Sequence, residues 1–95
     1  MTITKGYKQL IAEAREKIRT LSTEEAMAKF GDPNVVFVDI RDVRELEREG
    51  MIPNAFHAPR GMLEFWVDPA SPYHKPVFAD EGREFVLFCG AGWRS

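Results

Sequence analysis

The chain has 95 residues and forms at most one domain, because compact domains usually contain ~100–150 residues. Hydrophobic residues make up 44% and charged residues 29% of it, which excludes a disordered, collagen-like or coiled-coil protein. The 13 Lys and Arg against 15 Asp and Glu give a net charge of −2, so charge provides no reason to expect binding to nucleic acid or to an anionic membrane.

Two absences narrow the class of protein further. No apolar run approaches the ~18 residues of a membrane span, and the N-terminus lacks the apolar core of a signal peptide. Cys89 is the only cysteine, which excludes an internal disulfide framework and an all-cysteine metal site. We therefore expect a cytoplasmic protein with one thiol, with no metal and no cofactor.

Two helices are predicted at the start of the chain. Apolar residues spaced by three and four predict an amphipathic helix over 7–21, which we place in an N-terminal segment, 1–21. Its polar face mixes both charge signs, which disfavours a membrane-surface helix. Ser22 and Glu25 form a predicted capping box for a second helix, which Gly31 ends. The predicted buried residues of this second helix are Ala26, Met27 and Phe30.

The next elements alternate between strands and a helix. Residues 35–38 and 85–88 are continuous apolar runs, typical of strands that are buried on both faces of a parallel sheet. A short helix is predicted over 42–49, ending at Gly50, and a short strand over 55–58. This alternation predicts an α/β fold with an open sheet.

Residues 60–82 are predicted to be irregular, because three prolines exclude a long helix there, although 62–66 can form a turn or two. The segment is nevertheless aromatic, with Phe65, Trp66, Tyr73 and Phe78. We expect these side chains to cover the core. The alternative is that they form a wall that shapes a substrate site.

Cys89 directly follows the strand at 85–88, and ligands of open α/β sheets bind beyond the carboxyl ends of the strands. Gly90 and Gly92 allow a tight loop whose N–H groups turn inward, and Arg94 adds a positive charge. Such a loop favours a thiolate, a persulfide or a bound oxyanion. The alternative is a buried structural thiol. A nucleoside triphosphate site is disfavoured, because the loop lacks a Gly-Lys-Ser/Thr ending.

The chain resembles the rhodanese-like domains, a family of persulfide-forming sulfurtransferases. The resemblance rests on four stretches in order, which are Val36-Phe37-Val38-Asp39-Ile40-Arg41, Glu45, Gly50-Met51-Ile52-Pro53-Asn54-Ala55 and Cys89-Gly90-Ala91-Gly92-Trp93-Arg94-Ser95. It covers the chain from about residue 22 to the end. It implies a three-layer α/β fold with a parallel central sheet over 22–95.

The resemblance also implies an activity. Cys89 would take a sulfane sulfur from an anionic donor such as thiosulfate, and would pass it to a thiophilic acceptor such as cyanide or a thiol. Donor and acceptor would be small molecules or proteins. Amides of the loop would hold the persulfide, and Arg94 would bind the anionic part of the donor. The loop residues between them are Gly90, Ala91, Gly92 and Trp93.

Other residues of the family pattern receive supporting or structural roles. Asp39 and Arg41 would support the site from the neighbouring strand end, the alternative being a structural ion pair or cap. Met51 and Asn54 stand where the family frequently has His and Gly, which concerns the turn before the second strand. His57 and His74 offer no Cys–His dyad, so we expect them to be surface or structural residues.

Family members continue beyond this loop into a further helix, a strand and a final helix. The resemblance therefore implies that 22–95 is an incomplete domain, truncated or cleaved after Ser95. We expect such a piece to expose apolar surface and to have the C-terminal remainder of its own chain as a partner.

Two other functions remain open at this stage. Phosphatases and arsenate reductases also use a cysteine loop that ends in arginine, commonly with five intervening residues; here there are four, 90–93. The smaller loop favours a sulfur atom over a tetrahedral oxyanion. The third possibility is a non-catalytic interaction module, against which the presence of both Cys89 and Arg94 argues.

Overall fold

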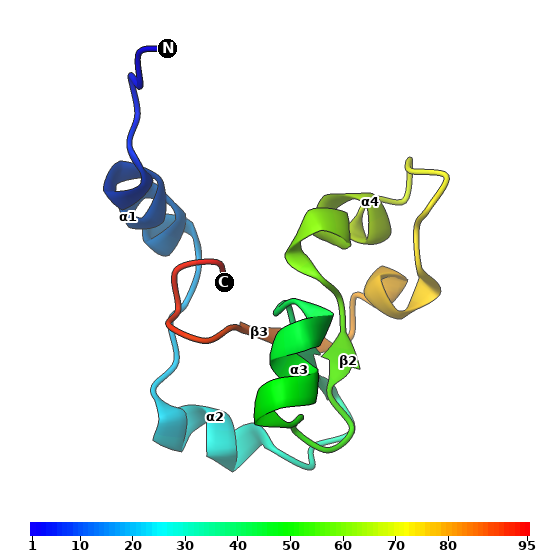
Figure 1. Cartoon of the computed structure of the whole chain (residues 1–95). Coiled ribbons are helices and arrows are strands. Elements are labelled where there is room, and N and C mark those ends of the chain that lie inside the picture. The colour runs from blue at the N-terminus through cyan, green and yellow to red at the C-terminus, as the bar shows by residue number, and fades with distance from the viewer.

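The computed structural model describes all 95 residues and contains a small parallel sheet with helices around it (Figure 1). The strands are β1 (Val35–Asp39), β2 (Phe56–His57) and β3 (Glu84–Phe88). The α-helices are α1 (Tyr7–Lys17), α2 (Thr23–Lys29), α3 (Val43–Glu49) and α4 (Leu63–Val67). Two 3₁₀ turns, η1 (Arg60–Met62) and η2 (Pro76–Ala79), lie between β2 and β3. None of the helices is long and apolar enough to cross a membrane.

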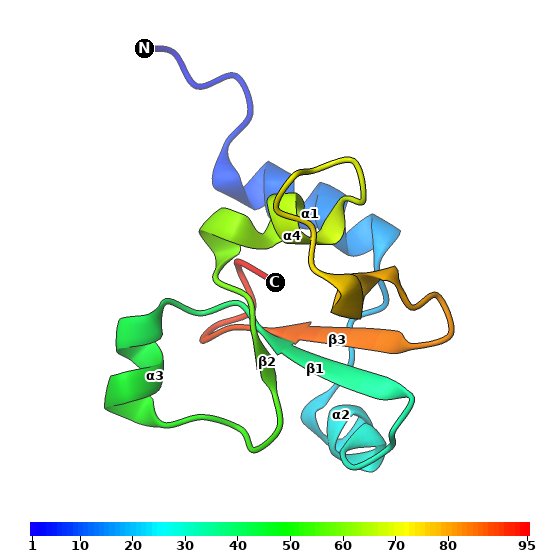
Figure 2. The same ribbon diagram turned by 90° about the vertical axis from the view of Figure 1, so that its right-hand side faces the viewer.

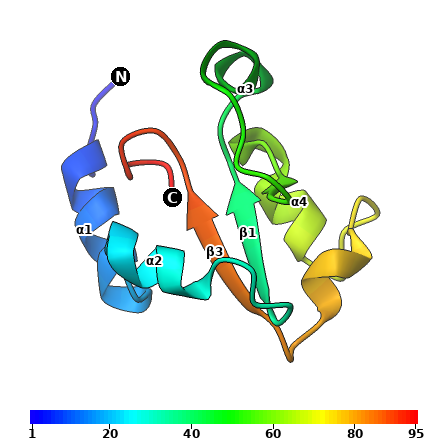
Figure 3. The ribbon, with the colours of Figure 1, turned by 90° about the horizontal axis from the view of Figure 1, so that it is seen from below.

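The three strands form one parallel sheet in the order β2-β1-β3, so the predicted α/β fold is confirmed (Figure 2). Figure 3 shows α1 and α2 on one side of the sheet and α4 on the other. β1 and β3 are paired along their whole length, from Val35 with Glu84 to Asp39 with Phe88. The residues after both strands therefore emerge at the same edge of the sheet, where open α/β proteins bind ligands.

The core lies where the strands meet α4 and the segment after it. Val38, Ile40 and Ala58 are fully buried. Trp66 and Phe78 pack against them, which confirms for these two aromatics the prediction that residues 60–82 cover the core. The same prediction is wrong for Phe65 and Tyr73, whose side chains are exposed. These two rings pack edge-to-face on each other, with centroids 6.5 Å apart.

The capping box that begins α2 is confirmed. Ser22 Oγ accepts a hydrogen bond from the Glu25 N–H, and the Glu25 carboxylate accepts one from the Ser22 N–H. The expected burial is wrong for Met27 and Phe30, whose exposed fractions are 71% and 51%. Phe30, the residue directly after α2, has an edge-to-face contact with Phe37 of β1, at 5.9 Å between ring centroids.

Helix α1 is shorter than predicted. It ends at Lys17, because Ile18 is already extended with φ −122° and ψ 160°. The apolar stripe that predicted the helix is real, but none of its residues is buried in this structure. Sequence periodicity reports which face of a helix is apolar, and it does not report what packs against that face.

The short helix before the second strand ends as predicted. Asp42 caps α3 at its N-terminus by accepting a hydrogen bond from the Arg44 N–H. Gly50 ends α3 with φ +87°, a backbone conformation that residues with a Cβ atom rarely adopt. The strand that follows spans two residues, Phe56 and His57, instead of the predicted four.

Candidate active site

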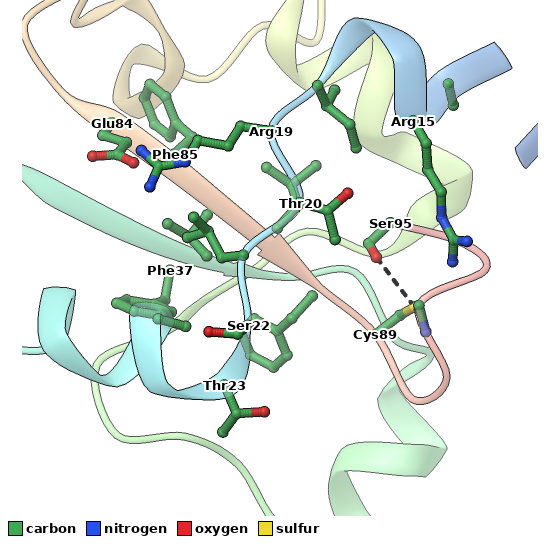
Figure 4. A pocket seen from close by; sticks show the side chains of 18 of the residues that line it. Arg15, Arg19, Thr20, Ser22, Thr23, Phe37, Glu84, Phe85, Cys89 and Ser95 are labelled. Atoms are coloured by element: carbon green, nitrogen blue, oxygen red, sulfur yellow. Dashed lines mark hydrogen bonds between the residues drawn. The ribbon is translucent and has the colours of Figure 1, made fainter. Parts of the chain in front are cut away.

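Cys89 lies at the carboxyl edge of the sheet, immediately after β3, and its side chain is half-buried against the core. The loop after it curls back toward α1 (Figures 1 and 3). This curl places the Gly92 N–H 3.2 Å from Cys89 Sγ, to which it donates. Gly92 adopts φ +80°, so the turn requires a residue without a Cβ atom at this position. The hydroxyl of Ser95 lies 3.6 Å from the same sulfur (Figure 4).

The environment of Cys89 favours its thiolate. Burial raises the pKa of the thiol, but the hydroxyl of Ser95 and the backbone N–H groups of Ser95, Arg94 and Gly92 outweigh it. Together they lower the pKa of Cys89 to about 7. Because the thiolate is the nucleophilic form of cysteine, Cys89 is more nucleophilic at neutral pH than a cysteine with an ordinary pKa.

Arg94 and Glu45 form a two-point ion pair across the mouth of the loop. Arg94 Nη1 lies 2.6 Å from Glu45 Oε1, and Nη2 lies 2.9 Å from Oε2. Glu45 Oε1 also accepts the N–H of Asp42, which anchors the carboxylate to the first turn of α3. These contacts lower the pKa of Glu45 to about 2 and raise that of Arg94 above its ordinary value, the hydrogen bonds within the pair being the main cause of both shifts.

Asp39 and Arg41 do not contact Cys89. They form a nearly buried ion pair at the end of β1, with 2.8 Å between Arg41 Nη2 and Asp39 Oδ2. Arg41 Nη2 also donates to the Gly50 carbonyl at 2.9 Å, and the Arg41 carbonyl is 2.7 Å from His57 Nε2. The pair therefore holds the strand end and the turn after α3 together.

An aromatic contact links α1 to the loop. The rings of Tyr7 and Trp93 are tilted against each other with centroids 5.4 Å apart. Both side chains are largely exposed, with exposed fractions of 55% and 63%. Ala91, the remaining residue of the predicted loop, is exposed as well. The first helix thus touches the cysteine loop, a neighbour that lies more than 70 residues away along the chain.

Cys89 also lies at one end of an apolar groove with a volume of about 940 Å³ (Figure 4). α1, α2, β3 and the cysteine loop form its walls, and Ile11 and Ala14 of the apolar stripe of α1 line it. Arg15 and Arg19 are its basic residues. The thiol is therefore flanked by two different surfaces, the polar rim at Arg94 and the apolar groove.

The structure brings together the predicted residues from Cys89 to Arg94, and it separates Asp39 and Arg41 from them. Ser95 was not predicted to touch the sulfur, and no role was predicted for Glu45. The spacing Asp42-x-x-Glu45 is a capping-box signal that could have located Glu45 at the start of a helix. The contact of Glu45 with Arg94 spans 49 residues and has no local signal.

Neither His57 nor His74 forms a hydrogen bond with the Cys89 thiol. His57 is bound to the Arg41 carbonyl, and Nδ1 of His74 is buried without a hydrogen-bond partner. No cluster of three or more His, Cys, Asp or Glu side chains is arranged to hold a metal ion. The chemistry of the site therefore centres on one thiol, inward N–H groups and an ion pair.

Comparison with known proteins agrees with this geometry. The family model of the rhodanese-like domain matches residues 22–95. A solved structure from Rhodopseudomonas palustris CGA009, of a protein of unknown function described as a possible tyrosine phosphatase, is 52% identical in sequence. The similarity has a TM-score of 0.93 and covers 100% of this chain and 73% of that one. No curated protein matches the chain. The chain belongs to the rhodanese-like domain family.

Proposed function

We propose that the protein is a sulfurtransferase that carries a sulfane sulfur as a persulfide on Cys89. The observation that carries this proposal is the contact of Cys89 Sγ with the Gly92 N–H and the Ser95 hydroxyl. Together with the backbone N–H groups of Arg94 and Ser95, they lower the pKa of the thiol to about 7. The same donors suit the terminal sulfur of a persulfide, which is also anionic. Membership of the rhodanese-like family supports the same reaction class.

The reaction has two displacement steps. The Cys89 thiolate attacks the outer sulfur of thiosulfate, the S–S bond of the donor breaks, and sulfite leaves with the electron pair. Cyanide or a thiolate then attacks the outer sulfur of the Cys89 persulfide and takes it, and the electron pair of the broken S–S bond returns to Cys89 as thiolate. No metal or cofactor takes part in this scheme, and no net oxidant is needed.

A phosphatase reaction is the second candidate, because the Rhodopseudomonas palustris protein is described as a possible tyrosine phosphatase. In that reaction Cys89 would attack phosphorus, and the loop would bind three phosphoryl oxygens. Two features favour sulfur transfer instead. Only four residues separate Cys89 from Arg94, and the Arg94 guanidinium already holds the Glu45 carboxylate.

Mass measurement of the intact protein after incubation with thiosulfate tests the proposal. We expect the protein to gain one sulfur atom, to lose it on addition of cyanide, and to gain none in the Cys89→Ser variant. Hydrolysis of p-nitrophenyl phosphate is measured on the same samples. Phosphate ester hydrolysis that depends on Cys89, without any sulfur gain from thiosulfate or from a second sulfane donor, would replace the proposal with the phosphatase reaction.

A further inference from the structure

Arg94, the cation at the mouth of the cysteine loop, is already paired with a carboxylate, so an anionic substrate does not meet an unpaired positive charge there. Arg94 uses both of its terminal nitrogens on Glu45, at 2.6 and 2.9 Å. The two side chains carry opposite unit charges, so their sum at the rim is zero. A loop that held Arg94 without Glu45 would offer a full positive charge to the same substrate.

Glu45 is also close to the space that a substrate must enter. A Cβ atom added at Gly90, the residue after the cysteine, would lie 3.4 Å from Arg94 Nη2 and 3.8 Å from Glu45 Oε2. The carboxylate therefore borders the loop itself. Its side chain is 20% exposed, and the capping contact with the Asp42 N–H keeps it in place. A unit charge that borders the loop changes the energy of a charged substrate bound in the loop, even in a partly hydrated site.

We infer that Glu45 is a specificity-determining residue of the cysteine loop, which it tunes toward sulfane donors that carry one negative charge and away from donors and esters that carry two. This inference rests on the proposed sulfurtransferase function. Glu45 acts through Arg94, whose guanidinium it orients, and through the repulsion between its own carboxylate and the second charge of the substrate. The matching donor class is a persulfide or a thiosulfonate, and phosphate monoesters are disfavoured for the same reason.

Two sulfur donors that differ in charge separate the effect of substrate charge from the other effects of the substitution. Thiosulfate carries two negative charges, and methanethiosulfonate carries one, with a methyl group in place of one oxygen. In both, the Cys89 thiolate attacks the outer sulfur and the S–S bond breaks; the leaving group is sulfite from the first donor and methanesulfinate from the second. Comparing each variant with the wild type for both donors cancels the difference in leaving group.

The test variant is Glu45→Gln, which removes the charge and keeps the shape. Glutamine also serves at this position of a capping box, so the start of α3 is retained. We expect kcat/KM for thiosulfate to rise about fivefold to tenfold relative to that for methanethiosulfonate. The matched control is Glu47→Gln, which removes the same charge from the same helix at a position without an ion pair to Arg94.

A second measurement does not depend on sulfur transfer. Cys89 is the only thiol, so its alkylation by anionic iodoacetate and by neutral iodoacetamide can be followed in the same protein. We expect Glu45→Gln to raise the rate ratio of iodoacetate to iodoacetamide about threefold or more, and Glu47→Gln to leave it unchanged. A change in the thiol pKa affects both reagents equally and does not alter the ratio.

The outcomes separate the two claims. An unchanged alkylation ratio in Glu45→Gln overturns the inference about charge and leaves the proposed function standing. An equal loss of activity with both donors, at an unchanged alkylation ratio, also overturns it, because Glu45 would then only position Arg94. A raised ratio without sulfur transfer from either donor supports the charge selection and counts against the sulfurtransferase.

Discussion

Asp39 and Arg41 are two residues apart at the end of β1, and their side chains meet at three N–O contacts of 2.8, 3.0 and 3.2 Å. Asp39 is 1% exposed, and its neighbour in the parallel register is Phe88, the last residue before Cys89. The pair supports the strand end next to the reactive loop without touching the thiol. Loss of this pair should therefore change the free energy of unfolding. Changes at Arg94, Glu45 and Ser95 should instead alter the reactivity of the Cys89 thiol.

Replacement of Asp39 with Asn is expected to lower the free energy of unfolding by about 3 kcal/mol, because it breaks the nearly buried pair and leaves Arg41 only the more exposed Glu49 carboxylate, 3.6 Å away. Burial opposes the charge on Asp39, but its hydrogen bonds and charge contacts with Arg41 are together stronger and lower its pKa. The stabilisation is therefore present above the pKa of an unfolded aspartate and is lost as the pH falls through the lower folded value.

Urea unfolding at neutral and acid pH measures both effects. We expect the wild type to lose more stability than Asp39→Asn on acidification, so that the two converge. The control is Asp42→Asn, whose exposed ion pair with Arg44 should contribute less than about 1 kcal/mol and whose capping role asparagine retains. A difference between wild type and Asp39→Asn that does not shrink in acid would contradict the account.

Replacement of Ser95 with Ala is expected to raise the pKa of Cys89 above its value of about 7, because the hydroxyl is the largest of the contributions that lower it. The alkylation rate of Cys89 with iodoacetamide, measured against pH, reports the thiolate fraction. At pH 7 the variant should react more slowly, and at high pH the two proteins should react alike. Ser95→Thr keeps a hydroxyl and should retain the low pKa; an unchanged pH profile in Ser95→Ala would remove Ser95 from the site.

Replacement of Arg94 with Ala is expected to raise KM for thiosulfate about tenfold or more, because the donor loses a cation and meets the unpaired Glu45 carboxylate. The free energy of unfolding should change by less than about 1 kcal/mol, since the pair is partly exposed. Steady-state transfer to cyanide measures the first effect and urea unfolding the second. Arg44→Ala, which removes an arginine from an exposed pair on α3, is the control; equal effects of the two variants on KM would assign no binding role to Arg94.

The features that the sequence predicts well are those set by neighbouring residues. Ser22 and Gly31 mark the ends of α2 through local hydrogen bonds and backbone freedom, and the apolar runs at β1 and β3 favour strands. Exposure was harder to predict, because Met27 and Phe30 lie on an apolar helix face whose burial depends on distant segments. The contact between Glu45 and Arg94 was hard to predict for the same reason, because it joins residues that are 49 positions apart in the chain.

The cysteine loop, residues 89–95, contains both features that the sequence predicts and contacts that it does not. Its composition predicts a reactive cysteine among inward N–H groups, and the Gly92 N–H does contact Cys89 Sγ. Which hydroxyl reaches the sulfur, and which carboxylate takes the arginine, depends on the three-dimensional path of the loop and on α3. Periodicity and spacing in a single sequence carry no information on either contact.

Replacement of Gly50 with Ala is expected to lower the free energy of unfolding by about 1–3 kcal/mol through the backbone alone. Gly50 adopts φ +87° and ψ 178°, a region that is essentially restricted to glycine. No atom beyond Gly50 and its two chain neighbours lies within 4 Å of the position that a Cβ would occupy, so contact with other parts of the protein adds nothing to the loss. The Gly50 carbonyl accepts from Arg41, and a strained turn would therefore also weaken the support of the strand end.

The matched control for this variant is Gly61→Ala, because Gly61 is also open to solvent around its Cβ position but lies outside the left-handed region. Urea unfolding of both variants should show a loss only for Gly50→Ala. Alkylation of Cys89 should keep its pH profile in both, since neither residue contacts the thiol. A loss of the same size in Gly61→Ala would mean that the added methyl group, rather than the backbone conformation of Gly50, is responsible.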